Sequence, residues 1–383
     1  MPWPVKDLIT VRLEFVNLAL QPDANIRQLC RRFEISPTAG YKWIARFKTL
    51  SAEGLTDQSR RPHHSPSQTT AGVEQELIAL RKKHPAWGAR KLRRRLQDLG
   101  HTSLPATSTI TGILHRHGLI DPLLSQASTP FERFERSQPN ELWQIDFKGH
   151  FPLKNGRCHP LGGLDDHSRY NVLLEACTNQ QEHTVQNRLA GAFRRHGLPD
   201  AILWDNGSPW GGGQSDYSTL DVWLMRLGIK VYHGRPYHPQ TQGKEERFHR
   251  TLKAEVLQQG GWQDCRHVQE AFDRWRPIYN TQRPHDMLDL DTPVSRYRPS
   301  QRSYPESLPP VEYDSSVEVR RVDAAGWISY RGQDWKIGRA FTGQDVGLRP
   351  GSTDGILEVI YLTQRIKELD LRQDLTQPAS KTL

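Results

Sequence analysis

The stretch from residue 142 to residue 228 alternates two kinds of hydrophobic pattern. Three short runs have the composition of strands, and they read LWQIDFKGH, LGGLDDHSRYNVLLEAC and LPDAILWDNG. Two longer runs space their apolar residues as a helix does, and they read TVQNRLAGAFRRHG and YSTLDVWLMRLG. Strands and helices that alternate in this way predict an α/β domain built on a sheet.

A helical region precedes this core. The segment NIRQLCRRFEISPTAGYKWIARF predicts one helix, a break, and a second helix that begins at Ser36 and Pro37, which suit a cap and a first turn. The pair has the form of a helix-turn-helix, and its second helix would present Thr38, Lys42 and Arg46 to DNA on one face. A small helical hairpin with no such role is the alternative.

Residues 56–70 are rich in Pro, Ser and His, lack a hydrophobic period and carry Arg60 and Arg61. These features predict a basic linker. We expect Arg60 and Arg61 either to lie along DNA phosphates or to stay solvated.

A second helical region follows the linker. Residues 81–95 hold eight Lys and Arg residues and no acidic residue, and Leu92, Leu96 and Leu99 form a stripe. This pattern predicts a helix that packs through leucine and points arginine outward, with Arg90 and Arg94 as DNA contacts. A further helix over residues 108–117 would complete a second helix-turn-helix, and its two histidines lack the spacing of a zinc site.

The last region, residues 310–373, contains five short runs with the alternation or composition of strands, separated by Gly, Asp and Pro. This pattern predicts a small β-barrel. The predicted organisation is therefore multidomain: 1–55 (first helix-turn-helix), 56–70 (linker), 71–121 (second helix-turn-helix), 122–139 (connector), 140–300 (α/β core) and 310–373 (barrel).

The net charge of the chain indicates the class of ligand that it binds. The 383 residues include 52 Lys and Arg against 43 Asp and Glu, a formal net charge of +9 that favours a polyanionic ligand such as nucleic acid. The four cysteines are far apart and include no CxxC pair, so the sequence predicts neither a disulfide framework nor a zinc knuckle. Since no apolar run approaches the length of a membrane span, we expect a cytoplasmic protein.

Several carboxylates in the α/β region are candidate metal ligands. Asp146 lies in the first strand-like run, and Asp205 follows an apolar strand, where carboxylates point into the crevice that binds ligands in α/β proteins. Taken alone, Asp205 also suits an ordinary turn. Asp165 and Asp166 are rival metal ligands, but their setting in the segment DDHSR is typical of a turn, so we rank them as structural.

A third carboxylate lies in PYHPQTQGKEERFHR, residues 236–250. A helix beginning near Lys244 would place Glu246, Arg250 and Lys253 on one face, whereas Glu245 would share another face with His249. This arrangement suits a metal ligand, Glu246, followed by two cations that contact successive DNA phosphates. An ordinary amphipathic helix with salt bridges is the alternative.

Four motifs in this order, WQIDFKG, LWDNGSPW, RPYHPQTQGKEERFHRTLKAE and YNTQRPHDMLDLDTPVSRYRP, closely resemble the integrase core of IS481-type DDE transposases, which are relatives of IS3-type transposases and retroviral integrases. The resemblance covers residues 140–299. It implies an RNase H-like core, an SH3-like tail and an acidic triad of Asp146, Asp205 and Glu246. The interval of 40 residues between Asp205 and Glu246 is longer than in typical retroviral integrases, and the retroviral His/Cys zinc module is absent.

The resemblance also implies the activity. Two Mg²⁺ ions, for which Mn²⁺ would substitute, are expected on the triad, and the protein would cleave DNA to free 3′-OH ends and then join them to target DNA. The expected partners are the terminal inverted repeats of a prokaryotic mobile element, target DNA and further copies of the chain in a dimer or tetramer. Expected DNA contacts in the core are Lys244, Arg247, Arg250 and Lys253.

Two other functions remain open from the residues. A domesticated transposase could bind element ends without cutting them, although an intact triad argues against this. A recombinase with a hydroxyl nucleophile would need a reactive Ser or Tyr, and Tyr279 is the tempting candidate.

Overall fold

The computed structural model describes residues 7–58, 68–120, 135–205, 207, 217–234 and 243–372. The chain divides into two compact units, residues 1–68 and residues 69–383. Arg60, Arg61 and most of the predicted connector lie outside the described residues, as do residues 206, 208–216 and 235–242. Among the described helices, none is long and apolar enough to cross a membrane.

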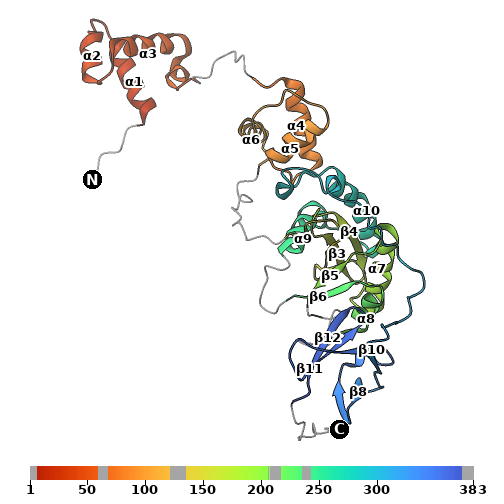
Figure 1. The fold of residues 1–383 in the computed structure, drawn as a ribbon. Coiled ribbons are helices and arrows are strands. Elements are labelled where there is room, and N and C mark those ends of the chain that lie inside the picture. Colours follow the sequence, from red (N-terminus) through yellow and green to blue (C-terminus); the bar gives the residue numbers. More distant parts are fainter. Residues whose placement is uncertain are drawn as a thin grey trace. The chain divides into compact units, whose positions relative to one another are not determined.

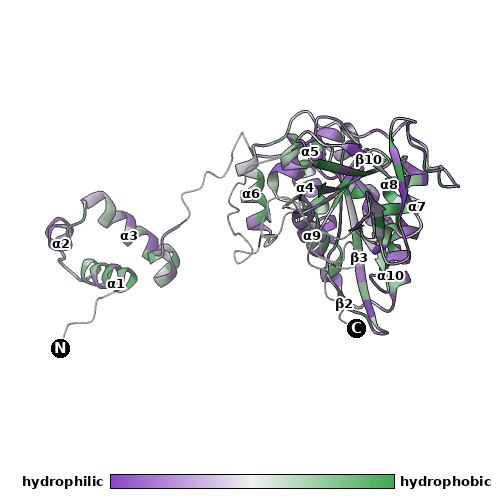
Figure 2. Ribbon diagram, turned by 60° about the horizontal axis from the view of Figure 1, so that its bottom comes forward, coloured by the Kyte–Doolittle hydropathy of each residue, from purple (hydrophilic) through white to green (hydrophobic). Residues whose placement is uncertain are grey.

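The first unit is helical. It contains α1 (Leu8–Ala19), α2 (Ile26–Arg32), α3 (Pro37–Leu50) and the 3-10 helix η1 (Ser51–Leu55) (Figure 1). The predicted start of the second helix is confirmed, because Ser36 Oγ accepts a hydrogen bond from the Ala39 amide and Pro37 occupies the first turn of α3. These helices mix hydrophilic and apolar residues, as expected for helices with one buried face (Figure 2).

The core of this unit depends on α1, which the sequence patterns did not predict. Phe15 and Val16 of α1 pack with Cys30 of α2 and Trp43 of α3. A Cβ atom at Gly40 would lie 2.5 Å from the Cys30 sulfur, so the helices approach too closely for a side chain there. The predicted helix pair is therefore part of a bundle of three helices.

The second helical region contains α4 (Ala71–Lys83), α5 (Ala89–Asp98) and α6 (Thr107–Arg116). The prediction of one basic helix over residues 81–95 is wrong, since the chain leaves the helix at His84 and enters a new one at Ala89. Pro85 explains the break, because proline disfavours helical geometry in the preceding residue. Leu77, Trp87 and residues of α5 and α6 form the core.

The expectation that every arginine here points outward is also wrong. Arg81 donates hydrogen bonds to the backbone oxygens of Trp87 at 2.6 Å and Leu119 at 2.9 Å, and Arg93 donates to another backbone carbonyl group. Leu99, expected in the packed stripe, is 56% exposed. Arginine therefore ties the helices of this region together as well as facing solvent.

The predicted α/β core is confirmed. Its strands are β1 (Trp143–Phe147), β2 (Phe151–Pro152), β3 (Arg157–Asp165), β4 (Asn171–Cys177), β5 (Ala201–Trp204) and β6 (Lys230–His233). They form one sheet in the order β2-β3-β1-β5-β6, with β4 paired to β3. The β1–β5 and β5–β6 pairs are parallel, and the β1–β3 and β3–β4 pairs are antiparallel.

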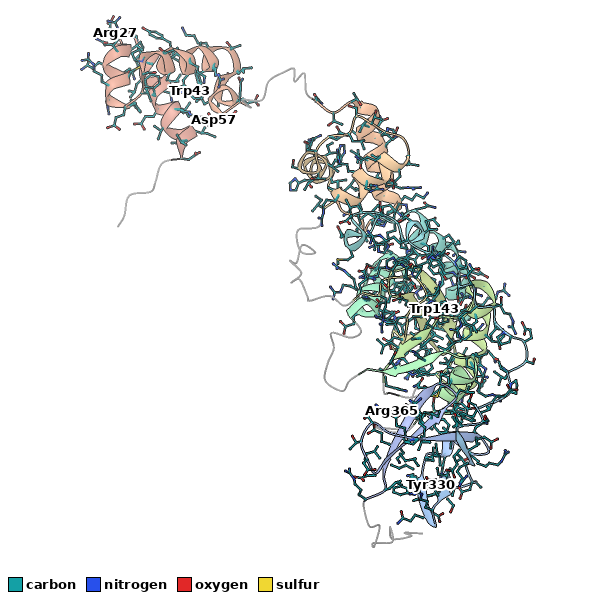
Figure 3. All side chains as sticks on the ribbon, viewed as in Figure 1. Arg27, Trp43, Asp57, Trp143, Tyr330 and Arg365 are labelled. Carbon is teal, nitrogen blue, oxygen red and sulfur yellow. The ribbon has the colours of Figure 1, made fainter. Side chains whose placement is uncertain are left out.

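Helices pack against both faces of this sheet. They are α7 (Glu182–His196), α8 (Thr219–Arg226), α9 (Gly243–Glu255) and α10 (Cys265–Thr281), with 3-10 helices η4 (Leu257–Gln259), η5 (Asp286–Leu288) and η6 (Pro293–Ser295). One apolar cluster joins Trp143 of β1 to α7 and α8 (Figure 3), and another joins Leu174 of β4 to α9 and α10. On β4, Leu173 belongs to the first cluster and Leu174 to the second, because neighbouring side chains of a strand face opposite sides of the sheet.

The tail contains β7 (Glu318–Arg321), β8 (Trp327–Tyr330), β9 (Gln333–Lys336), η7 (Arg339–Phe341), β10 (Asp345–Pro350), β11 (Ile356–Tyr361) and β12 (Gln364–Asp370). The five predicted strands are confirmed, and β12 is an addition. Within residues 311–372, the pairings give a sheet in the order β12-β11-β10-β7 and a separate β8–β9 hairpin. The tail is therefore sheet-rich, while closure into a barrel remains a prediction.

One side chain of the tail bonds to the edge of the central sheet. Gln364 accepts a hydrogen bond from the Val231 amide at 3.0 Å and donates one to the Val231 carbonyl oxygen at 3.2 Å. Val231 belongs to β6, the last strand of the sheet order.

Candidate active site

Asp146 and Asp205 are carried by neighbouring parallel strands. Asp146 is a residue of β1, and Asp205 directly follows β5, while Gln144 and Leu203 are opposite each other in the register of the pair. Because the strands run in the same direction, both carboxylates are at the same end of the sheet, where α/β proteins bind their ligands.

The surroundings of Asp146 disfavour its charge. Its side chain is 21% exposed, and burial together with the nearby carboxylates of Asp205 and Glu246 raises its pKa to about 7. The Phe147 backbone amide acts in the opposite direction. Asp205 and Glu246 are therefore each close enough to Asp146 to disfavour its negative charge.

Asp205 is held by short-range contacts. Its carboxylate accepts a hydrogen bond from the Gly207 amide at 3.0 Å, and its backbone oxygen lies 3.3 Å from His233 Nδ1. The other nitrogen of His233 lies 3.4 Å from the Asp221 carboxylate, which is fully buried. Asp205 thus has partners on its side chain and on its backbone.

The two adjacent glutamates of α9 have opposite environments. Glu246 is exposed, and so are Arg250 and Lys253, whereas Glu245 is 1% exposed and His249 is also buried. The burial pattern matches the helix phase expected from the sequence. Burial, followed by the Asp146 charge, raises the pKa of Glu245 well above its ordinary value.

The donor set fits a hard divalent cation. Carboxylate oxygens are the preferred ligands of Mg²⁺, and among the described residues no Lys or Arg forms an ion pair with Asp146, Asp205 or Glu246. Uncompensated negative charge in a partly buried site favours a bound cation. Across the described part of the chain, however, no three such side chains are close enough to hold one ion together. The three carboxylates are therefore suitable ligands by type, but their side chains are not grouped around one point.

Asp165 and Asp166, the rival ligands, are both fully buried, and their carboxylates bind other groups of the protein. Asp165 accepts hydrogen bonds from the Ser168 amide at 2.8 Å and the Ser168 hydroxyl at 2.5 Å. Asp166 accepts from Gln144 Nε2 at 2.6 Å and pairs with the Lys244 ammonium group. These contacts suit a structural role.

The predicted DNA contacts in the first unit have mixed environments. Thr38 and Lys42 are exposed on α3. Arg46 is half-buried and donates a hydrogen bond to Gln58, while Lys42 and Arg46 each lie 5.2 Å from the ring centre of Trp43. Thr38 and Lys42 are therefore the freer of the three to reach a ligand.

The predicted contacts on α5 already have acidic partners. Arg90 pairs with Asp286 at 2.9 Å, and Arg94 pairs with Asp291 at 2.8 Å. Lys91, between them, lies 3.4 Å from Asp286. The basic face of α5 is thus docked on the segment that follows α10.

On α9 the predicted contacts divide into two groups. Lys244 is partly buried against Asp166, whereas Arg247, Arg250 and Lys253 are exposed. Only the exposed group is free to meet a phosphate without breaking an ion pair.

Sequence reasoning missed four residues around the triad: His249, Glu245, His233 and Asp221. The helix phase placed Glu245 and His249 together but gave no sign that they meet Asp146. Asp221 has a local signal, because Ser218 and Asp221 form a capping box at the start of α8. His233 has no such signal, since its partners come from other elements.

Tyr279 does not suit the role of a nucleophile. It is 3% exposed, and burial raises its pKa. Its ring packs edge-on against Phe248 and His285. A buried, protonated phenol cannot attack DNA, so the structure argues against the recombinase alternative.

Comparison with known families agrees with this arrangement. Two models of the integrase core domain match residues 136–239 and 227–293. A helix-turn-helix domain model matches residues 11–63, a homeodomain-like model matches residues 39–114, and the model of the IS481 family transposase C-terminal domain matches residues 317–377. Models of helix-turn-helix domains, of the integrase core domain and of the IS481 transposase C-terminal domain thus match successive parts of the chain.

Proteins similar to this chain include mobile-element proteins. It is 23% identical over 258 residues to a putative transposase for insertion sequence element IS5376 from Geobacillus stearothermophilus, covering 63% of this chain and 62% of the relative. It is 26% identical over 172 residues to the transposase for IS904 from Lactococcus lactis, covering 44% and 66%. The chain thus spans less than two thirds of the length of these relatives.

Among solved structures, the chain is similar to a protein of the simian T-cell lymphotropic virus intasome, solved in complex with PP2A regulatory subunit B56 gamma. The identity is 18% and the TM-score is 0.38, with 75% of this chain and 96% of the other covered.

Proposed function

We propose that the chain is a DNA transposase that binds the ends of a mobile element, hydrolyses phosphodiesters to free 3′-OH ends and joins those ends to DNA. The observation that carries the proposal is the placement of Asp146 and Asp205 at one end of the sheet, with Glu246 near enough to raise the pKa of Asp146. The match to integrase core models supports it. The core is then RNase H-like, and the tail is an SH3-like module.

Asp146, Asp205 and Glu246 would hold Mg²⁺ or Mn²⁺, in a two-ion site. Such ions supply activation of an attacking oxygen and stabilisation of a leaving oxygen. The protein itself supplies the positions of the three carboxylates, two from strand ends and one from α9. Water that attacks a phosphodiester would break its P–O3′ bond and free a 3′-OH. That 3′-OH would then attack a second phosphodiester and displace the 3′-oxygen there, so one site would serve both reactions.

The exposed cations of α9 would contact the DNA next to this site. Arg250 and Lys253 share the exposed face of Glu246, so DNA phosphates that meet one would meet the others. The helical regions 1–55 and 71–121 would recognise the element ends, joined by the linker 56–70. A dimer or tetramer on DNA would allow two ends to be joined together.

The test compares Asp146→Asn, Asp205→Asn and Glu246→Gln with the unchanged protein, using duplex DNA from the flanks of the gene. Each substitution should remove Mg²⁺-dependent cleavage and joining while end binding persists, because a neutral amide cannot balance a divalent cation. A Glu246→Gln protein that joined ends at the original rate would refute the assignment.

A non-cleaving DNA-binding regulator is the alternative function. It predicts end binding by the unchanged protein with no cleavage in Mg²⁺ or Mn²⁺. The same assay therefore separates the two functions.

A further inference from the structure

A buried carboxyl group lies directly beneath the candidate active site and is not part of the triad. Glu245 belongs to the first turn of α9 and is 1% exposed. Burying a carboxyl group costs several kcal/mol unless polar partners compensate. The Asp146 carboxylate, the Leu164 backbone amide and the imidazole of His249 are the polar groups that act on it, and among the described residues no partner is in full hydrogen-bonding geometry with either Glu245 oxygen.

His249 lies between Glu245 and the triad. Its Nε2 atom is 3.7 Å from Glu245 Oε2, and its Nδ1 atom is 3.8 Å from Asp146 Oδ2. Glu245 and His249 are four residues apart on a helix, so their side chains share a face and support each other. Each nitrogen of the ring therefore faces a different carboxyl group.

The sheet is shaped to admit this pair. Gly162 of β3 is directly opposite Asp146 in the β1–β3 ladder. A Cβ atom at Gly162 would lie 3.2 Å from His249 Nε2 and 3.4 Å from Glu245 Oε2. A bare glycine thus lets α9 bring both side chains to the strand that carries Asp146.

We propose that Glu245 and His249 are positioning residues for Asp146: Glu245 holds one nitrogen of the His249 ring, and the other nitrogen holds the Asp146 carboxylate toward the metal. This inference rests on the proposed function, since it assumes that Asp146 is a metal ligand. Groups behind a ligand orient it, and their loss weakens metal binding even though they do not touch the ion.

The experiment measures Mn²⁺ binding by calorimetry, DNA cleavage at saturating Mn²⁺, and the metal-free melting temperature of the full chain. Glu245→Leu and His249→Leu should weaken Mn²⁺ affinity by roughly 10- to 100-fold, while the metal-free melting temperature stays level or rises because a buried polar group is gone. Glu245→Gln, which keeps a polar partner for the ring, should lose less Mn²⁺ affinity than Glu245→Leu.

Controls separate this inference from the proposed function. Thr251→Ala, on the same helix, removes a hydroxyl that donates to the Arg247 carbonyl oxygen and should leave Mn²⁺ affinity unchanged. If the unchanged protein binds no Mn²⁺, or if Asp146→Asn does not abolish that binding, the proposed function fails and this inference fails with it. If that binding is present but both leucine variants match the original affinity and cleavage rate, the positioning role alone is refuted.

If a leucine variant does not fold, His249→Gln and Glu245→Gln provide the measurement. The positioning role then predicts weaker Mn²⁺ affinity for His249→Gln than for Glu245→Gln, because only the former alters the group that meets Asp146. Equal affinities that match the original would overturn it.

Discussion

Lys244 and Asp166 form an ion pair inside the core, although they are 78 residues apart in the chain. Asp166 is fully buried, and the Lys244 side chain is 18% exposed. Burial is the main cause that lowers the pKa of Lys244, and Asp166 acts in the opposite direction. The pair joins the start of α9 to the end of β3. It therefore fixes the position of the first turn of α9, which carries Glu246.

We predict that Lys244→Met lowers the free energy of unfolding by about 3 kcal/mol, since a buried carboxylate loses its cation. Lys253→Ala, at an exposed position, should change it by less than about 0.5 kcal/mol but reduce the salt dependence of DNA binding by about one unit of slope. Urea denaturation and binding titrations across a salt series measure both effects. A Lys244→Met protein of unchanged stability that bound DNA less well would show that Lys244 contacts DNA instead.

The raised pKa of Asp146 predicts a pH dependence of stability. The unfolded carboxyl group ionises near 3.8 and the folded one near 7, so between these values the folded state binds more protons. The free energy of unfolding of the metal-free protein should therefore fall as pH rises from 4 to 7, by at most about 4 kcal/mol from this group. Asp146→Asn should reduce the fall, as measured by urea midpoints at several pH values. An identical fall in the variant would contradict the assignment.

The docking of α5 depends on one aspartate. Asp286 pairs with Arg90 and with Lys91, whose side chain is 16% exposed and whose pKa is lowered to about 8, chiefly by burial. Asp286→Ala should cost about 1 to 3 kcal/mol, because a partly buried ammonium group loses its partner. Hydrogen exchange should show the loss in α4, α5 and α6.

Asp289 is the matched control for Asp286. Its side chain is 97% exposed, and its ion pair with Arg296 is 3.6 Å long. Asp289 has a left-handed backbone conformation (φ 55°), which asparagine tolerates better than alanine. Asp289→Asn, which removes only the charge, should therefore leave both the unfolding midpoint and the exchange rates unchanged. Equal effects of the two substitutions would argue against a docked α5.

Tyr279→Phe should retain DNA cleavage and joining in full. The phenol is buried among aromatic rings, so losing its hydroxyl group should change stability by no more than about 1 kcal/mol. A cleavage assay on element ends measures this, and a loss of all cleavage would revive the recombinase alternative.

Local signals predicted much of the fold. The Ser36 cap, the Pro37 first turn and the apolar runs of β1, β3, β4 and β5 depend on residues close together in the chain, which a pattern can capture. The phase of α9 was predictable for the same reason, because it follows from helical spacing alone.

Contacts between distant elements were not predictable. The phase of α9 separates Glu245 from Glu246, but it cannot reveal that Gly162 lies where Glu245 and His249 arrive. Likewise, the charge of α5 suggested DNA, whereas its acidic partners lie in a segment far along the chain. A basic helix looks the same in sequence whether its counter-charge is a phosphate or an aspartate.

The side chain of Gln364 imitates one residue of a neighbouring strand. An amide side chain carries a donor and an acceptor, as a peptide unit does, and here both are spent on the donor and acceptor of Val231. An exposed outer strand is a template for unwanted pairing with another chain. At Val231 that template is already filled, so two copies of the core that met along β6 could not extend the sheet continuously past this residue without first displacing the tail.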